Sequence, residues 1–201
     1  MKINFALDTD SDPTVWLGMP ILDGRGASRE RRKWARHTSE LVWSLAQTPP
    51  EGKGDIKELA RQLEATAELL PQKVPVHQVF LYMPDPRREF LNFLVHIDAS
   101  EGEVESTLEG LVQKNAAGAI QDPEVTDFDT EHLGRGMRSI RYFASSKAGT
   151  ICCSVNYAWR IESKGIDLVV RTISENIGWV TANIDEFDSF SRSLRVMESS
   201  S

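Results

Sequence analysis

The stretch Thr150–Ile161 constrains the fold most strongly, because its residues alternate between two chemical kinds. One set is apolar and the other is mainly small or polar: Ile151, Cys153, Val155, Tyr157, Trp159 and Ile161 against Thr150, Cys152, Ser154, Asn156, Ala158 and Arg160. Successive side chains of a β-strand point to opposite faces of the sheet. The alternation therefore predicts a strand with one buried face and one face in water.

A second strand is predicted immediately after the first. Residues 166–173 are rich in β-branched side chains and follow a four-residue turn that ends in Gly165, which indicates an antiparallel hairpin. Residues 134–143 supply a third strand of the same meander. Two more strands are predicted at 74–83 and 90–97, joined through a turn with two prolines, and a short strand over residues 1–7 is expected at the sheet edge.

Helical periodicity predicts helices in four further segments. The expected spans are 28–47 with Ser28 as N-cap, 55–70 ended by Pro71, 100–115 opened by a Ser100–Glu103 capping box, and 185–197. The first two are joined by a short linker, so we expect them to pack as an antiparallel pair. The predicted fold class is α+β, with an antiparallel sheet, a long C-terminal meander, and helices packed on its apolar face. We expect one domain over residues 1–201, with the helical pair at about 28–70 and the sheet and closing helix at about 74–197.

Composition excludes several classes of function. The net charge of −7 argues against a general affinity for nucleic acid, since binding to phosphates needs clustered cations. No apolar run approaches the ~18 residues of a membrane span, and the N-terminus has no signal-peptide pattern. We expect a soluble cytoplasmic protein without membrane or nucleic-acid partners.

Two groups of residues are candidate partner-binding surfaces. The first is a basic cluster on the opening turns of the helix at 28–47, formed by Arg29, Arg31, Arg32, Lys33 and Arg36. Cations are disfavoured at a helix N-terminus, so the cluster suggests a docking site for an acidic protein surface; the alternative is a solvated face paired with acids elsewhere. The second is the wet sheet face that carries Asn156 and Arg160, with Arg171 nearby, which would suit an acidic segment or an anionic small molecule. An ordinary solvated sheet face is the alternative there.

Histidines and carboxylates give weaker chemical signals. His96 with Asp98, or His132 with its neighbouring carboxylates, could serve as a general acid or base. No second histidine stands at a ligand spacing from His132, so we predict no metal site. No cofactor motif occurs, and we predict no cofactor.

Several segments carry a resemblance to known proteins. They are Leu133–Tyr142, Asn156–Glu162, Asp167–Arg171 and the closing Asp-Glu-Phe-Asp helix. In these the chain resembles uncharacterised proteins of actinobacteria, and more distantly the PsbP-like α+β sandwich. The resemblance implies a binding or assembly role, and it assigns no catalytic residue.

These observations together favour a non-enzymatic protein-interaction or assembly module. Its partner would be an unidentified protein or a second copy of the chain. The alternative is a small-molecule-binding protein or a hydrolase-type enzyme that uses His96 and Asp98, or His132, as acid and base.

Overall fold

The structure of the protein is a computed structural model, and residues 5–145 and 149–198 are described. Its contacts group the chain into two compact units. One unit joins the N-terminal residues up to Ser11 with everything from Phe93 onward, and the other is Asp12–Asn92. The strands before residue 92 are therefore grouped with the helical pair, whereas the prediction described the helical pair at about 28–70 and the sheet from about 74 as parts of one domain.

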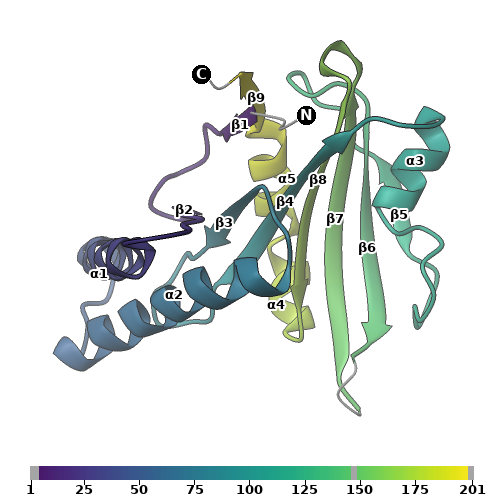
Figure 1. Ribbon diagram of the computed structural model, residues 1–201. Coiled ribbons are helices and arrows are strands. Elements are labelled where there is room, and N and C mark those ends of the chain that lie inside the picture. The colour runs from purple at the N-terminus through teal and green to yellow at the C-terminus, as the bar shows by residue number, and fades with distance from the viewer. Residues whose placement is uncertain (1–4, 146–148, 199–201) are drawn as a thin grey trace. The chain divides into compact units, whose positions relative to one another are not determined.

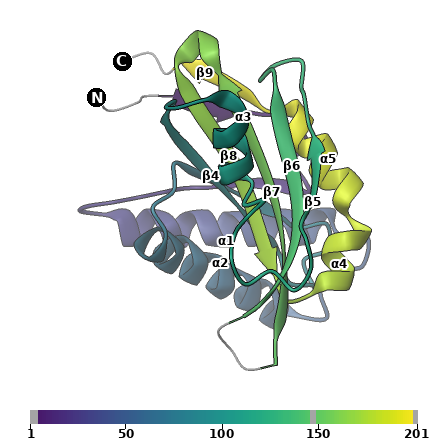
Figure 2. The same cartoon turned by 90° about the vertical axis from the view of Figure 1, so that its right-hand side faces the viewer.

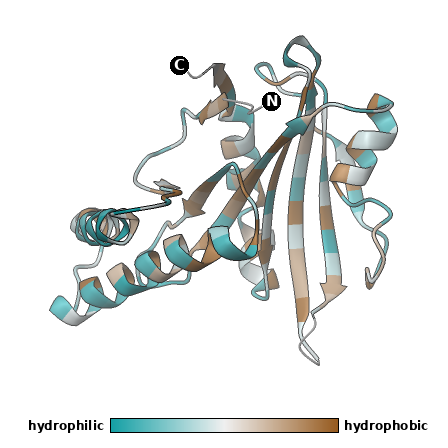
Figure 3. Ribbon diagram, in the orientation of Figure 1, coloured by the Kyte–Doolittle hydropathy of each residue, from teal (hydrophilic) through white to brown (hydrophobic). Residues whose placement is uncertain are grey.

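The larger unit is built on an antiparallel sheet. Its strands are β4 (Leu91–Ala99), β5 (Glu124–Asp127), β6 (Gly136–Ala144), β7 (Ile151–Ile161) and β8 (Ile166–Ser174), in the spatial order β4-β8-β7-β6-β5. The predicted meander β6-β7-β8 is confirmed, and Figure 1 shows its long strands side by side. Along β7 the hydropathy changes from residue to residue, as Figure 3 shows.

Helices α4 (Ile177–Ala182) and α5 (Ile184–Ser193) cover the apolar face of this sheet. Phe93 of β4 packs against Phe187 and Phe190 of α5, with ring centroids 5.0 and 5.8 Å apart. Trp159 of β7 is 0% exposed, and its indole N–H donates to the carbonyl of Phe128 at 3.1 Å. The predicted burial of this face is confirmed.

The closing helix is shorter than predicted. It ends at Ser193, and Arg195–Glu198 form strand β9, which pairs antiparallel with β1 (Phe5–Asp8). The prediction of helix to residue 197 was wrong because the apolar residues after Ser193 fit a helical spacing equally well. The part of the first predicted strand before Phe5 lies outside the described residues.

Helix α3 (Val104–Leu111) lies on the opposite face of the sheet from α5, as Figures 1 and 2 show together. Beneath it is a second small core. Its buried members are Leu108, Val112, Met137, Ala158 and Val169. The helix begins later than predicted, with Glu103 rather than Ser100 as its N-cap.

The smaller unit contains two strands and two helices: β2 (Trp16–Met19), β3 (Gln78–Tyr82), α1 (Ala27–Leu45) and α2 (Lys53–Lys73). The strands pair antiparallel, with the rings of Trp16 and Tyr82 4.8 Å apart. The contacts between α1 and α2 run in opposite chain directions: the start of α1 meets the end of α2, with Arg31 3.6 Å from Glu68, and the later part of α1 faces the start of α2. The helices therefore pack antiparallel, as predicted, and they cross at an angle, since Figure 1 shows α1 nearly end-on while α2 runs across the view.

The ends of these two helices also differ from the predictions. The N-cap of α1 is Gly26, whose φ of 95° suits glycine, and not Ser28. Helix α2 continues through Pro71 to Lys73, so Pro71 lies within its last turn. The α+β class with an antiparallel sheet and packed helices is confirmed, whereas the single folding domain stays a prediction.

Gly136 gives a direct test of the sheet packing. A Cβ there would stand 2.7 Å from the Ala158 carbonyl oxygen and closer still to the Trp159 ring. We expect Gly136→Ala to lower the free energy of unfolding by about 1–3 kcal/mol through overpacking, measured by urea denaturation. Gly178→Ala in α4, where a Cβ meets nothing within 4 Å, is the control, and an equal loss there would contradict this packing.

Candidate functional site

The polar face of β7 is not in water, which overturns the predicted wet surface. Asn156 is 0% and Arg160 8% exposed, and Ser154 is as deeply buried. Helix α3 and the residues that flank it cover this face. The pattern of polar residues correctly predicted a strand, but its polar side meets other side chains and backbone carbonyls of the protein.

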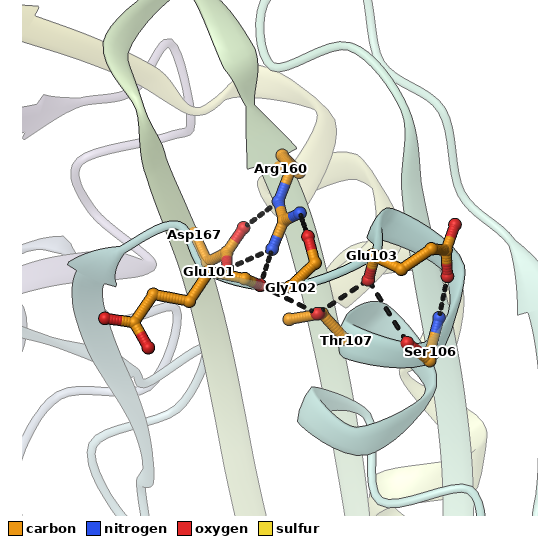
Figure 4. Close-up of polar contacts among 7 residues, drawn as sticks. All are labelled: Glu101, Gly102, Glu103, Ser106, Thr107, Arg160 and Asp167. Carbon is orange, nitrogen blue, oxygen red and sulfur yellow. Dashed lines mark hydrogen bonds and ion pairs between the residues drawn. The ribbon is translucent and has the colours of Figure 1, made fainter.

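Arg160 holds the chain that leads into α3 (Figure 4). Its guanidinium forms two hydrogen bonds with the carboxylate of Asp167, at 2.7 and 2.8 Å. It also donates to the carbonyls of Glu101 and Gly102, at 2.7 and 2.8 Å. The hydrogen bonds that Arg160 donates to the Asp167 carboxylate raise the pKa of the Arg160 guanidinium. Arg160 therefore fixes the N-terminal approach of α3 to the sheet.

The first turn of α3 is closed by its own residues. The Glu103 side chain accepts from the backbone N–H of Ser106 at 2.9 Å, and this bond lowers the pKa of the Glu103 carboxyl. A carboxylate at a helix N-terminus also interacts favourably with the macrodipole. Thr107 donates to the carbonyls of Glu101 and Glu103 (Figure 4).

The C-terminal end of α3 has four carbonyls without helical partners, as every α-helix does. Two are satisfied by a Schellman motif. The N–H of Lys114 donates to the carbonyl of Glu109 and that of Gln113 to the carbonyl of Gly110, both at 3.0 Å. Gln113 stands in the left-handed region, with φ of 62°, where glycine is usual.

The sheet satisfies the other two carbonyls. Arg171 of β8 donates to Leu111 O at 3.0 Å, and the hydroxyl of Ser139 on β6 donates to Val112 O at 2.5 Å. A cation at a helix C-terminus is stabilised by the macrodipole. The polar face of the sheet is therefore the C-cap of α3.

Asn156, on the middle strand β7, connects Arg171 of β8 with Ser139 of β6. Its carbonyl oxygen accepts from Arg171 Nε at 2.6 Å, and its amide donates to the hydroxyls of Ser139 at 3.1 Å and Ser154 at 3.3 Å. Burial lowers the pKa of Arg171, and the nearby charge of Arg141 lowers it further. Asn156, Arg160 and Arg171 thus make internal contacts. The sequence did not reveal them because the carbonyls that the two arginines bind are on another element, and the side-chain partners of Asn156 are mostly on neighbouring strands.

The basic cluster of α1 divides into an inner and an outer part. Arg31 is turned inward: its side chain is 13% exposed, donates to Leu22 O at 3.1 Å and lies 3.6 Å from Glu68. Arg29, Arg32 and Arg36 are exposed. Arg32 pairs with Glu64 at 3.3 Å, and Arg36 pairs with Glu40 at 2.9 Å. Such exposed pairs contribute little to stability.

A groove of 680 Å³ lies between α1 and α2. It is lined by five cationic side chains, from Arg32, Arg36, Lys53, Lys57 and Arg61. Two carboxylates also line it, and Ile56 and Ala60 give it an apolar part. The sequence prediction found the two arginines of α1 and missed the three cations of α2, because only the crossing of the helices brings them together. We call this feature the basic groove.

The candidate acid–base residues are placed as follows. His96 and Asp98 are two residues apart on β4 and so share a face, with Asp98 exposed. His132 is exposed and lines a pocket of 380 Å³ with Arg135, Arg160 and Glu162. Among the residues that the structure describes, no group of three or more His, Cys, Asp or Glu is arranged to hold a metal ion. The acid–base role stays a prediction.

Comparisons with known proteins give a distant structural likeness and no match in sequence. No family model matches the chain, and no curated protein is detectably similar to it in sequence. A solved structure of LpqN, described as involved in cell envelope biogenesis of Mycobacterium tuberculosis, is similar at a TM-score of 0.45 and 10% identity, over 60% of this chain and 71% of that chain. A likeness at this level carries no argument. No helix in the described ranges is long and apolar enough to cross a membrane.

The left-handed residue at the end of α3 predicts a stabilising substitution. Gln113→Gly should raise the free energy of unfolding by about 0.5–1 kcal/mol, because glycine avoids the Cβ clash of that conformation at some cost in unfolded-chain entropy. Denaturant unfolding measures the change. Gln113→Ala keeps the Cβ and should not stabilise; a gain from alanine as large as that from glycine would contradict the motif.

Removing a side chain of the sheet that caps α3 should destabilise the protein. Ser139→Ala leaves the buried carbonyl of Val112 and one amide hydrogen of Asn156 without their partner. We expect a loss of about 1–3 kcal/mol in the free energy of unfolding. Ser189→Ala on the exposed side of α5 should stay within about 0.5 kcal/mol. Equal effects of the two changes would show that Ser139 caps nothing.

Proposed function

We propose that the chain is a non-enzymatic protein-interaction module that docks an acidic amphipathic helix of a partner protein in the basic groove. The observation that carries this proposal is the groove itself, where cations from two helices surround an apolar strip. A helix with one apolar and one acidic face matches both properties, which is the established helix-in-groove mode of recognition.

The charges of the groove support an acidic partner. Arg32 and Arg36 are each matched by one carboxylate, and Arg61 pairs with Glu58 outside the groove lining. Lys53 and Lys57 have no carboxylate within 4.0 Å among the described residues. The groove is therefore net positive in a protein whose net charge is −7. A local field of opposite sign to the whole molecule favours partners with concentrated negative charge.

The exposed surface of α1 extends the same charge beyond the groove. Arg29 and Lys33 lie on the exposed side of the helix with Arg32 and Arg36 and line a shallow depression of 410 Å³. The spacing i, i+3, i+4, i+7 aligns the four cations along one stripe. Acidic residues at the rim of a docked helix would face this stripe.

The wider parts of the proposal come from the sequence alone. They are a cytoplasmic location, an assembly role like that of the PsbP-like sandwich, and a partner that is either another protein or a second copy of the chain. The acidic stretch at Asp122–Glu131 makes the second copy a partner to include in the test.

The test uses a synthetic amphipathic helix with glutamates on one face and leucines on the other, measured by fluorescence anisotropy. We expect saturable binding that weakens with added salt. The double variant Arg36→Glu, Lys57→Glu should raise Kd at least about tenfold, or 1.4 kcal/mol. Both side chains are exposed, so folding should be retained.

A matched control separates the groove from overall charge. Arg87→Glu with Arg88→Glu makes the same change in net charge on an exposed turn of the same unit. This control should leave the Kd for the same helix within about twofold of the wild-type value. Equal weakening by the two double variants, or no binding by the wild type, would refute the groove. A peptide that spans residues 122–131 of this chain tests self-association in the same assay.

A further inference from the structure

Two arginines on the α3 side of the sheet have no acidic partner among the described residues. Arg141 of β6 is 7% exposed, and Arg171 of β8 is partly buried. Neither has a carboxylate within 4.0 Å among the described residues. The other two arginines of these strands differ: Arg160 pairs with Asp167, and Arg138 pairs with Asp188 at 2.6 Å.

The neutral groups that hold Arg141 and Arg171 offset only part of their charge. Arg141 donates to Ala117 O at 2.6 Å and stacks 4.6 Å from the Phe143 ring centroid. Arg171 donates to Asn156 and to Leu111 O. The C-terminus of α3 contributes roughly half a negative charge, whereas the two guanidiniums carry two positive charges. At least about one positive charge of the pair is therefore not balanced by the groups around it. Buried charge without a counter-ion is costly.

The sheet register brings the two arginines toward one another. Arg141 stands opposite Ser154 on β7, and Arg171 stands opposite Asn156, the next residue of β7 on the same face. The two guanidiniums are close enough that the charge of Arg141 lowers the pKa of Arg171. Both side chains therefore lie on the α3 face of the sheet, on the two strands that flank Ser154 and Asn156 of β7.

Several N–H donors of the two guanidiniums remain available to a ligand. A guanidinium has five N–H groups, and the described contacts use one of Arg141 and two of Arg171. The Nε of Arg141 is buried and has no hydrogen-bond partner within the part of the chain that the structure describes. Arg171 is partly exposed, which gives an anion access from solvent.

We propose that Arg141 and Arg171 form a binding site for an oxyanion, a phosphate or a carboxylate group, held between the two guanidiniums above Ser154. Planar guanidinium forks match the oxygen spacing of both groups. The bound anion supplies the charge that the pair lacks and accepts from the free donors. This site is separate from the basic groove and does not depend on it.

The experiment follows the Nε–H signals of the arginines by ¹⁵N NMR during titration with inorganic phosphate and, in a second arm, acetate at constant ionic strength. The signals of Arg141 and Arg171 should shift along one saturation curve. The signal of Arg160, whose Nε is held by Asp167 at 2.7 Å, should stay in place. The arm with the lower Kd identifies the preferred anion.

A conservative variant completes the test. Arg141→Lys keeps the charge but loses the fork, and it should raise the Kd for the preferred anion at least about fivefold, with Arg135→Lys as an exposed control that leaves it unchanged. The proposal is overturned if neither anion moves the two signals, if all arginine signals shift together, or if Arg141→Lys binds as well as the wild type.

Discussion

The capture of α3 carbonyls by side chains of the sheet is the interaction on which the larger unit depends. Arg160 holds the carbonyls before the helix, and Arg171 and Ser139 hold the two at its end that the Schellman motif leaves free. A buried carbonyl without a partner costs about 1–3 kcal/mol, so α3 could not cover the sheet without these donors. The helix in turn shields the polar face of β7 and closes the second core around Leu108.

The sequence predicted where the strands of the sheet lie better than it predicted what their polar side chains contact. Alternation located β7, and the Gly165 turn located β8, because both signals are local. The partner of the polar face was not predictable in the same way. A serine, an asparagine and an arginine on one face of a strand look identical whether they meet water or other groups of the protein. The carbonyls that Arg160 binds lie 58 and 59 residues earlier in the chain, and the carbonyl that Arg171 binds lies 60 residues earlier.

The difference between local signals and contacts of distant residues also explains the predictions for α1 and β9. The basic character of α1 was readable from its residues, but the inward turn of Arg31 depends on Glu68 and on Leu22 O, and the groove needs cations from α2. Strand β9 was missed because its existence depends on pairing with β1, at the other end of the sequence. The basic groove and the arginine pair on the sheet, the two proposed binding sites, are both places where the tertiary structure gathers charge.

The two adjacent cysteines test the central claim most directly, because they lie on opposite faces of β7. Cys152 shares the face that carries Asn156 and is 6% exposed, and Cys153 shares the Trp159 face and is 0% exposed. Burial raises the pKa of the Cys153 thiol to about 11. The measurement is the rate of iodoacetamide labelling at each position, read by mass spectrometry under native conditions. A covered face predicts that both thiols label only as fast as the protein opens; rapid labelling of Cys152 alone would show that the polar face of β7 lies in water after all.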